Sequence, residues 1–343
     1  MSFASVRGQS AAVEQLRAAL SAGRLAHAYL FTGPEGVGKR TLARELARAV
    51  LCEARGTDAC DRCASCRAVA SGNSPDFATL AVEDSGGKIR LLDDSDRQIK
   101  IGSIRAMESD LRLKSASGRT RVYLIPGAER MNEEAANALL KTLEEPVGSR
   151  LLILTSARPE ALLPTVLSRV ARVRLRRLAE KEVADYLAAE RKLPGQEARE
   201  LAAASGGSIG AALAASLDSV RAAQKLLRES LARFPLPPPL ALAGAMMAFA
   251  REARDSGAGR DRELEPLRRG LLALWTQALA LYRQALARAL GAPGGEAAGA
   301  EMAALGPERL ERALESLLRA DRAVRDYASP ELVCRVLAGE LAG

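Results

Sequence analysis

The stretch of residues 28–41, AYLFTGPEGVGKRT, decides the fold of the N-terminal part of the chain. It begins as a short apolar strand, continues as a glycine loop and leads into a helix-forming segment. The loop nearly matches G-x-x-x-x-G-K-[ST], the pattern of loops that bind nucleotide phosphates: Gly33, Gly38 and Lys39 are in place, but Arg40 stands at the hydroxyl position. The stretch therefore predicts an α/β core with a phosphate loop, and it leaves open whether that loop still binds a nucleotide.

The loop contains residues that shape it and residues that would act on a nucleotide. Gly36 and Gly38 allow backbone N–H groups to turn toward an anion, and Lys39 would reach the terminal phosphates. The Arg40 guanidinium has only donors, so it cannot ligate the Mg²⁺ ion that accompanies ATP, and Thr41 comes one residue late. We therefore expect a vestigial phosphate loop, with weak or absent ATP binding. A glycine-rich turn without any ligand is the less favoured interpretation.

An ATPase of this kind also needs carboxylates at the end of a later strand, where one helps to hold Mg²⁺ and another orients the attacking water. The candidate strand is 121–125, RVYLI, but Pro126 and Gly127 follow it. Glu129 comes too late in the sequence to replace the missing acidic pair without a reshaped turn. Without either contact to the metal, phosphoryl transfer lacks its electrostatic support, so we expect no ATPase activity from the chain by itself.

Four of the five cysteines lie close together in the sequence, at Cys52, Cys60, Cys63 and Cys66. The two C-x-x-C steps can bring thiolates onto one tetrahedral ion, and Cys52 would complete the shell from the end of the preceding helix. Because four protein ligands leave no open coordination position, the pattern predicts a structural zinc site rather than a catalytic one. Four unrelated thiols are the alternative.

Strand-like and helical segments alternate up to about residue 177, which predicts a parallel sheet with helices on both faces. Two further buried strands are expected at 121–125 and 151–155. After residue 177 the pattern is helical only, in keeping with 48% hydrophobic but only 3% aromatic residues. The expected helical segments include 180–190, 196–204, 208–217 and 270–290, with breaks at 234–240, 255–259 and 291–295.

Charge and targeting signals limit the classes of function. The formal net charge of +8 over 343 residues permits contact with an anionic partner without requiring one. No apolar block precedes a signal-peptide cleavage site at the start, and the longest apolar run, 240–250, is too short to span a bilayer. Clustered cysteines without a secretory signal indicate metal binding in a reducing cytosol, so we expect a cytoplasmic protein.

Several segments together carry a resemblance to one family. They are GQSAAVEQLRAAL, RLAHAYLFTGPEGVGKRTLARELARAVLC, the cysteine cluster, SPDF, NALLKTLEEP and LPTVLSRV. With them the chain resembles the subunits of the bacterial DNA polymerase III clamp loader, of the AAA+ class, and among these the delta-prime subunit. The resemblance covers most of residues 1–215 and only loosely the helical C-terminal third. NALLKTLEEP followed by LSR is specific to clamp-loader subunits within the wider class.

The resemblance implies three domains. Residues 1–177 would form an AAA+ core, a parallel sheet with flanking helices, which includes a four-cysteine zinc module at 52–66. Residues 178–220 would form a small helical lid, and residues 221–343 an all-α collar through which a hetero-pentameric ring assembles. The expected partners are gamma/tau-like ATPase and delta-like subunits, and within the complex also the sliding clamp and primer–template DNA.

The resemblance also implies a division of labour at the ATP sites. Delta-prime subunits do not hydrolyse ATP, and the arginine of their SRC motif reaches the ATP held by the adjacent motor subunit. Here that motif reads Ser168-Arg169-Val170, so the arginine is kept. The lid arginine that senses nucleotide in motor subunits is absent, because residues 207–210 read GSIG. The chain would thus be a non-hydrolysing subunit of the DNA polymerase III holoenzyme, in the cytoplasmic replisome at the nucleoid, that supplies Arg169 as an arginine finger in trans.

Other interpretations stay open. The chain could be an active gamma/tau-like ATPase in which Thr41 and Glu129 fill the vacant roles, or an AAA+-like scaffold outside the replisome. Arg169 could also be a solvated arginine at the end of a strand, since further arginines at 172, 174, 176 and 177 alternate with Val173 and Leu175. The LSR context favours the arginine finger.

Overall fold

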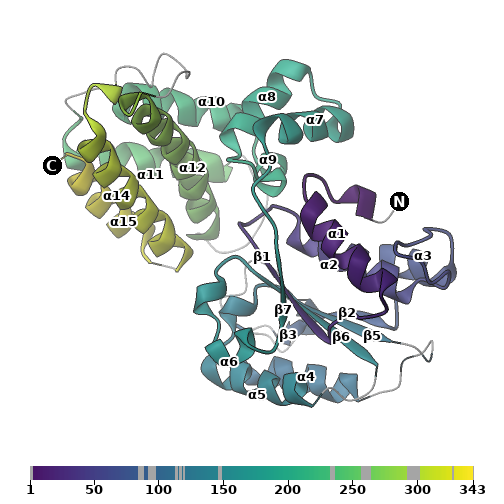
Figure 1. Cartoon of the computed structure of the whole chain (residues 1–343). Coiled ribbons are helices and arrows are strands. Elements are labelled where there is room, and N and C mark those ends of the chain that lie inside the picture. The colour runs from purple at the N-terminus through teal and green to yellow at the C-terminus, as the bar shows by residue number, and fades with distance from the viewer. Residues whose placement is uncertain are drawn as a thin grey trace. The chain divides into compact units, whose positions relative to one another are not determined.

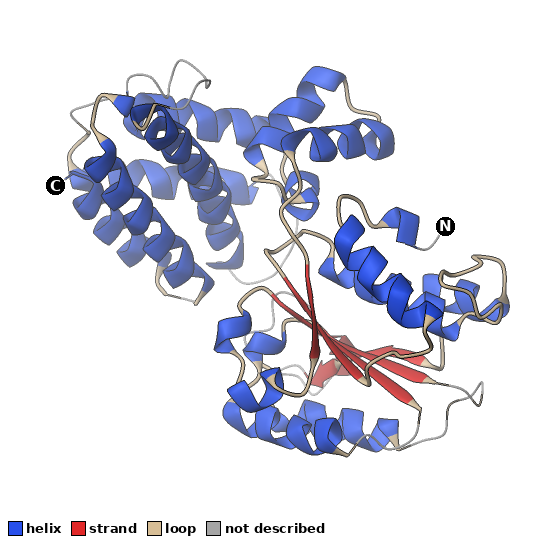
Figure 2. Cartoon of the chain, in the orientation of Figure 1, coloured by secondary structure: helices blue, strands red, loops and turns tan. Residues whose placement is uncertain are grey.

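The structure, a computed structural model, forms two compact units, Met1–Glu182 and Val183–Gly343. The first unit contains a sheet with helices, and the second contains helices (Figures 1 and 2). The residues whose structure is described are 3–83, 89–91, 98–112, 115, 118, 120–145, 149–231, 236–255, 264–291, 302–326 and 328–342. The expected α/β core followed by helices is confirmed.

A five-stranded sheet of the first unit, in the order β2-β5-β6-β1-β7, has only parallel pairings. Its strands are β1 (Ala28–Thr32), β2 (Phe77–Thr79), β5 (Arg121–Ile125), β6 (Arg150–Ser156) and β7 (Ala171–Arg174). The three inner strands are almost continuously apolar and buried, as expected when helices cover both faces of a sheet. A separate antiparallel ribbon pairs β3 (Ala81–Glu83) with β4 (Ile89–Leu91).

The two faces of the sheet pack against different helices. Tyr29 and Phe31 of β1 face α1 (Ser10–Ser21) and α2 (Lys39–Leu51), whereas Leu30 faces the side of α4 (Ile101–Leu111) and α5 (Glu133–Glu144). This follows from the alternation of side chains along a strand. Figure 1 shows the two pairs of helices on opposite sides of the sheet. The remaining short elements of the unit are η1 (Phe3–Ser5), α3 (Ala64–Ala70), η2 (Ala128–Arg130), η3 (Pro159–Ala161) and α6 (Pro164–Leu167).

Helix α5 illustrates why these segments are helical. The side chain of Asn132 accepts a hydrogen bond from the N–H of Ala135 and so caps the first turn. Glu133 and Glu134 place negative charge at the positive end of the helix dipole. Apolar residues at helical spacing, including Leu139 and Leu143, face the sheet.

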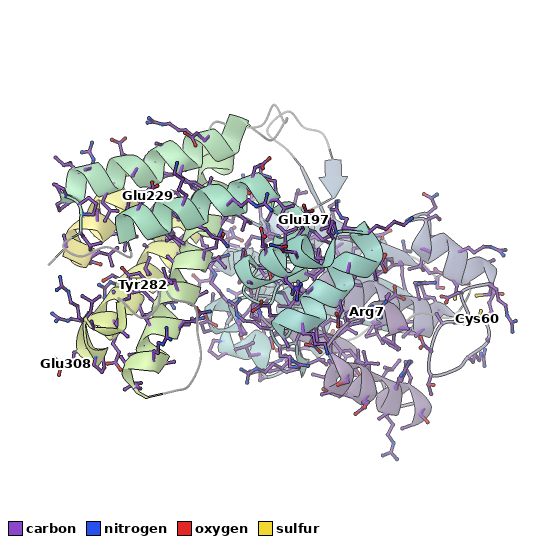
Figure 3. The ribbon with its side chains drawn as sticks, turned by 90° about the horizontal axis from the view of Figure 1, so that it is seen from above. Arg7, Cys60, Glu197, Glu229, Tyr282 and Glu308 are labelled. Carbon is purple, nitrogen blue, oxygen red and sulfur yellow. The ribbon has the colours of Figure 1, made fainter. Side chains whose placement is uncertain are left out.

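The regular elements described in the second unit are all helices. Its helices are α7 (Glu180–Arg191, begun in the first unit), α8 (Gly195–Ala204), α9 (Ile209–Ala214), α10 (Leu217–Leu226), a π-helical turn η4 (Leu227–Leu231), α11 (Pro239–Asp255), α12 (Leu264–Ala289), α14 (Pro307–Arg325) and α15 (Pro330–Ala342). The predicted helix 270–290 corresponds to the later part of α12, where Trp275 and Tyr282 fill the core between α11, α14 and α15. Figure 3 labels Tyr282.

Some expectations fall on residues outside the described ranges. The breaks expected at 255–259 and 291–295 are described only at their first residues, and the proline-rich break at 234–240 only from residue 236. The boundary between the two units lies at residue 182, and a further division near residue 220 stays a prediction. No helix in the described part of the chain has the length and apolar character needed to cross a membrane.

Candidate functional site

The phosphate loop, residues 33–38, joins β1 to α2 and keeps the backbone shape that its glycines predict. Gly33 has φ +145°, and a Cβ added there would lie 2.4 Å from the carbonyl oxygen of Leu175 at the end of β7. The N–H of Gly33 donates to the carbonyl of Ser156 at the end of β6. Gly38 ends the loop with φ +101°, a conformation that side chains rarely adopt. The loop is therefore held against the carboxyl ends of two strands.

Lys39 folds back onto the loop. Its Nζ donates to the carbonyl oxygens of Gly33 at 2.6 Å and Pro34 at 2.7 Å. The ammonium group thus lies inside the curve of the loop, where a phosphate-binding lysine is expected. Arg40 and Thr41, on the first turn of α2, are both exposed. The only hydroxyl of these two residues is that of Thr41, one position after the place where the nucleotide-binding pattern has its Ser or Thr.

The turn after β5 carries a cation where an ATPase carries its acids. Gly127 has φ +62°, and Arg130 folds over it, so that Nη2 donates to the carbonyl of Pro126 at 3.1 Å. A Cβ added to Gly127 would lie 2.5 Å from Nε of Arg130. An aspartate could not replace Gly127 without displacement of the guanidinium. The sequence shows the missing acids, but the arginine that covers their place is a finding of the structure.

Glu129 points to a neighbouring strand. Its Oε1 accepts a hydrogen bond of 3.0 Å from the N–H of Ala157, just after β6, and its buried Oε2 has no hydrogen bond among the described residues. Beside it, the buried hydroxyl of Thr155 accepts from the N–H of Gly127 at 3.2 Å. Sequence reasoning did not single out Thr155. Its signal was a polar pair, Thr155-Ser156, that follows the apolar run 151–154 of a central strand.

Arg169 lies far from the phosphate loop of its own chain. It follows α6 and precedes β7, where Ala171 pairs with Tyr29, whereas the loop begins level with Leu175. The strand residues between these levels span about 13 Å at ~3.3 Å per residue. Nη1 of Arg169 donates to the Thr165 carbonyl at 3.0 Å. Arg169 and the phosphate loop are therefore at opposite ends of the sheet.

A surface ion pair holds Arg169. Its Nη2 lies 2.8 Å from Oε1 of Glu144, the last residue of α5, and the two side chains are 36% and 49% exposed. Ion pairs this accessible contribute little, about 0–1 kcal/mol. Arg172 and Arg174 in β7 are also exposed and alternate with buried Val173, as the sequence predicted.

The four predicted metal ligands come together. The Sγ atoms of Cys52, Cys60, Cys63 and Cys66 all lie within 4.8 Å of one another. In a tetrahedral site with Zn–S bonds of about 2.3 Å, sulfur atoms are separated by roughly 3.8 Å, so the cluster has the dimensions of such a site. Figure 3 shows Cys60 on the loop of this cluster. The cysteine module, residues 52–66, can therefore hold a metal ion with these four residues.

Backbone N–H groups support the sulfur atoms in sequence. The N–H of Cys60 donates to Sγ of Cys52 at 3.4 Å, that of Cys63 to Cys60 at 3.4 Å, and that of Cys66 to Cys63 at 3.3 Å. Hydrogen bonds from the backbone of Arg62 and Cys63 lower the pKa of Cys60 to about 6. Burial raises the pKa of Cys66, so metal binding would release its proton.

Two aspartates fasten the cysteine module to the rest of the unit. Asp61 pairs with Arg48 of α2, which also binds Glu45 at 2.9 Å. Asp58 accepts from Arg17 of α1 at 2.7 Å and from the N–H of Phe3 at 3.0 Å. The phosphate loop lies at the N-terminal end of α2, and the cysteine module lies at its C-terminal end.

Comparison with known proteins places the chain in a family. The model of the family described as "DNA polymerase III, delta subunit" matches residues 8–179. The chain is 35% identical to the DNA polymerase III subunit delta' of Pseudomonas aeruginosa over 223 residues, 62% of this chain and 64% of that one. It is 34% identical to the DNA polymerase III subunit tau/gamma of Haemophilus influenzae over 188 residues, 54% of this chain and 25% of that one.

The match thus spans less than two thirds of each of these relatives. Among solved structures, a DNA polymerase III gamma subunit-related protein of Thermotoga maritima aligns with 96% of this chain and 98% of its own, at 17% identity and a TM-score of 0.39. The family match takes in the phosphate loop, the cysteine module and Arg169, and by it the chain belongs to the DNA polymerase III delta-subunit family.

Proposed function

We propose that the chain is a non-hydrolysing subunit of the clamp loader, which stabilises the ring and supplies Arg169 in trans to the ATP site of a neighbouring subunit. The observation that carries the proposal is the position of Arg169 before β7, at the end of the sheet opposite the chain's own phosphate loop. An arginine so far from its own loop can act on a triphosphate only if another subunit holds it. Hydrolysis in that subunit would then drive loading of the sliding clamp onto primed DNA.

The chain's own loop supports the same assignment. Position 40 lacks the metal-binding hydroxyl, and Arg130 covers the turn where acidic residues would hold Mg²⁺. Both changes put a guanidinium near the place of the Mg²⁺ ion, so the metal ion would meet repulsion there as well as a loss of ligands. We expect weak or absent ATP binding, with little dependence on Mg²⁺.

The surroundings of Arg169 fit a residue that changes partners. Its pair with Glu144 is open to solvent on both sides, so little free energy holds the guanidinium in place. A triphosphate in a dry interface offers more negative charge and a bidentate geometry, which arginine binds well. Glu144 would keep Arg169 extended until a neighbouring subunit docks.

The test is the DNA-stimulated ATPase activity of the loader assembled with its gamma/tau-like and delta-like subunits. Arg169→Ala should lower hydrolysis at the adjoining site by about 10³-fold or more, because the charge of the transition state loses its partner. Assembly should be unchanged, as judged by the mass of the complex. Arg172→Ala, which removes another exposed arginine three positions away, is the matched control and should leave the activity intact.

If Arg169→Ala leaves the activity of the assembled loader unchanged, the trans role is wrong. If the chain does not assemble with clamp-loader subunits at all, the remaining interpretation is an AAA+-like scaffold outside the replisome. The roles of residues 178–220 as a lid and 221–343 as a collar belong to the same proposal. Removal of residues 221–343 should abolish assembly of the ring, and retained assembly would contradict the collar assignment.

A second candidate function is that of an active gamma/tau-like ATPase. Two observations favour it: the similarity to a tau/gamma subunit, and the buried Oε2 of Glu129 that has no hydrogen bond among the described residues. In that case Thr41 and Glu129 would serve the metal and the water. Mg²⁺-dependent turnover by the isolated chain, abolished in Glu129→Gln and retained in the matched Glu133→Gln, would establish this function and refute the first.

For the cysteine module we propose a structural zinc ion. Four cysteine thiolates favour zinc among the metals of the cytosol, and they fill its coordination shell. Elemental analysis of the purified chain should return about one zinc per chain. Cys334→Ala, at a buried cysteine in α15 outside the cluster, should keep this ratio, whereas a ratio near zero in the unaltered chain would refute the proposal.

A further inference from the structure

One buried amide joins the phosphate loop to the segment by which the chain leaves the sheet. Gln9, directly before α1, is only 3% exposed. Its Oε1 accepts a hydrogen bond of 3.0 Å from the N–H of Arg176, and its Nε2 donates to the carbonyl of Arg176 at 2.8 Å. The same Nε2 donates to the carbonyl of Val37 at 3.4 Å. These partners fix the orientation of the amide, since both carbonyls require a donor and the N–H requires an acceptor.

The position of the Val37 carbonyl, which accepts a hydrogen bond from Gln9, depends directly on the shape of the loop. Val37 lies between Gly36, with φ +70°, and Gly38, with φ +101°, and it is itself buried. The direction of its carbonyl is set by these two left-handed residues. Any change in the curvature of the loop, whether from an anion or from a substitution, would therefore move the group that Gln9 binds.

The other partner of Gln9, Arg176, belongs to the exit segment, residues 176–182, which leads from β7 into α7. Glu182 accepts from the N–H of Ala179 at 2.7 Å and so caps the first turn of α7, and it also pairs with Arg176 at 3.2 Å. Gly8, with φ +65°, lets the backbone next to Gln9 approach Leu178, whose Cγ would lie 2.9 Å from an added Cβ. Residues 8 and 9 thus contact the exit segment at Arg176 and Leu178.

We propose that Gln9 is a positioning residue that couples the conformation of the phosphate loop to the exit segment. Loss of the amide would remove a hydrogen-bond partner from three backbone groups, the N–H and carbonyl of Arg176 and the carbonyl of the buried Val37. Because α7 continues across residue 182, the exit segment is also the covalent connection to the second unit. The coupling requires neither ATP nor a partner subunit, so it stands independently of the role proposed for Arg169.

A rival route must be separated from this one. Gly33 also approaches the end of β7, and the N–H of Leu175 donates to the carbonyl of Thr32 at 2.7 Å. If the loop communicated through these contacts, Gln9 would add nothing. A perturbation within the loop, measured at the exit segment with and without Gln9, distinguishes the two routes.

The experiment is a double-mutant cycle read by hydrogen exchange in the full chain. Gly38→Ala strains the loop without a clash, since an added Cβ meets nothing within 4 Å. The reporter is the N–H of Ala179, which does not contact Gln9. We expect Gly38→Ala to raise its exchange rate about 10-fold when Gln9 is present. In the Gln9→Ala background the rate should already be raised, and Gly38→Ala should add less than about 2-fold.

Gln15→Ala is the matched control. Gln15 lies on α1, the helix that Gln9 precedes, and donates to the carbonyl of Arg172 at 3.3 Å, but its amide is exposed and has no hydrogen bond to the loop. In its background the full effect of Gly38→Ala on Ala179 should persist. Equal effects of Gly38→Ala with and without Gln9 would overturn the proposal, and so would a uniform rise of exchange across residues 3–182 in Gln9→Ala. If Gln9→Ala does not fold, Gln9→Glu replaces it, because it keeps the acceptor and the size but removes the donor to the carbonyls of Val37 and Arg176.

Discussion

The phosphate loop and the cysteine module lie at the two ends of α2 and differ in what they keep. The loop keeps its backbone, with Gly33 against Leu175 and a left-handed Gly38, but Arg40 stands at its hydroxyl position and Pro126 and Gly127 follow β5. The module keeps every side chain of its predicted site, and the four sulfur atoms converge. The comparison teaches that backbone shape alone does not indicate chemistry, whereas convergence of ligand atoms does.

The largest expected effect tests the module. Cys66→Ser, at a fully buried ligand, should abolish zinc binding and destabilise the first unit by more than about 4 kcal/mol, because the metal contributes folding free energy. Zinc content and urea unfolding measure the two effects. Full stability without zinc would remove the contrast between the two regions.

The next effect tests whether α2 connects the two regions. Arg48→Ala leaves the Glu45 carboxylate, whose side chain is 7% exposed, without this partner, and should cost about 3 kcal/mol. Arg44→Ala, on the exposed side of α2, is the matched control and should stay within about 0.5 kcal/mol. Urea unfolding of the zinc-loaded chain gives both values. Equal values for the two variants would show that the ion pairs do not fasten the module.

The third effect tests whether the loop is held by its backbone. Gly33→Ala places a Cβ 2.4 Å from the Leu175 carbonyl and should destabilise the first unit by about 3 kcal/mol. Gly38→Ala meets no neighbouring atom and should cost only about 1 kcal/mol, from backbone strain alone. Thermal unfolding compares them. A cost at Gly38 as large as that at Gly33 would mean that close packing does not define the loop.

The smallest effect tests whether one side chain restores the chemistry. Arg40→Ser completes the loop pattern, but Arg130 still covers the turn after β5. Nucleotide affinity, measured by calorimetry with and without Mg²⁺, should therefore change by less than about 3-fold, and no turnover should appear. The control is Arg44→Ser on the same helix. Mg²⁺-dependent hydrolysis in Arg40→Ser would show that the loop lacks only its hydroxyl.

Local patterns predicted a large part of this molecule. The strands at 121–125 and 151–155, the helix around Trp275 and the meeting of the cysteines follow from periodicity and spacing over short distances. The contacts that join distant segments were not predicted. Gln9 meets Arg176 across 167 positions, and no pattern near either residue announces this pairing. The fold of Arg130 over Gly127 is local, but it depends on a left-handed turn that the sequence alone does not specify.

The position of β7 at one edge of the sheet has a consequence for the solubility of the chain. An edge strand with unpaired backbone groups invites β-strand addition by another copy, and thus aggregation. Here β7 spans only Ala171–Arg174, its exposed side chains are two arginines, and Gln15 covers the carbonyl of Arg172. Like charges would repel a second β7 laid alongside the first. The cations at this edge therefore disfavour the pairing of β7 with a second copy of itself.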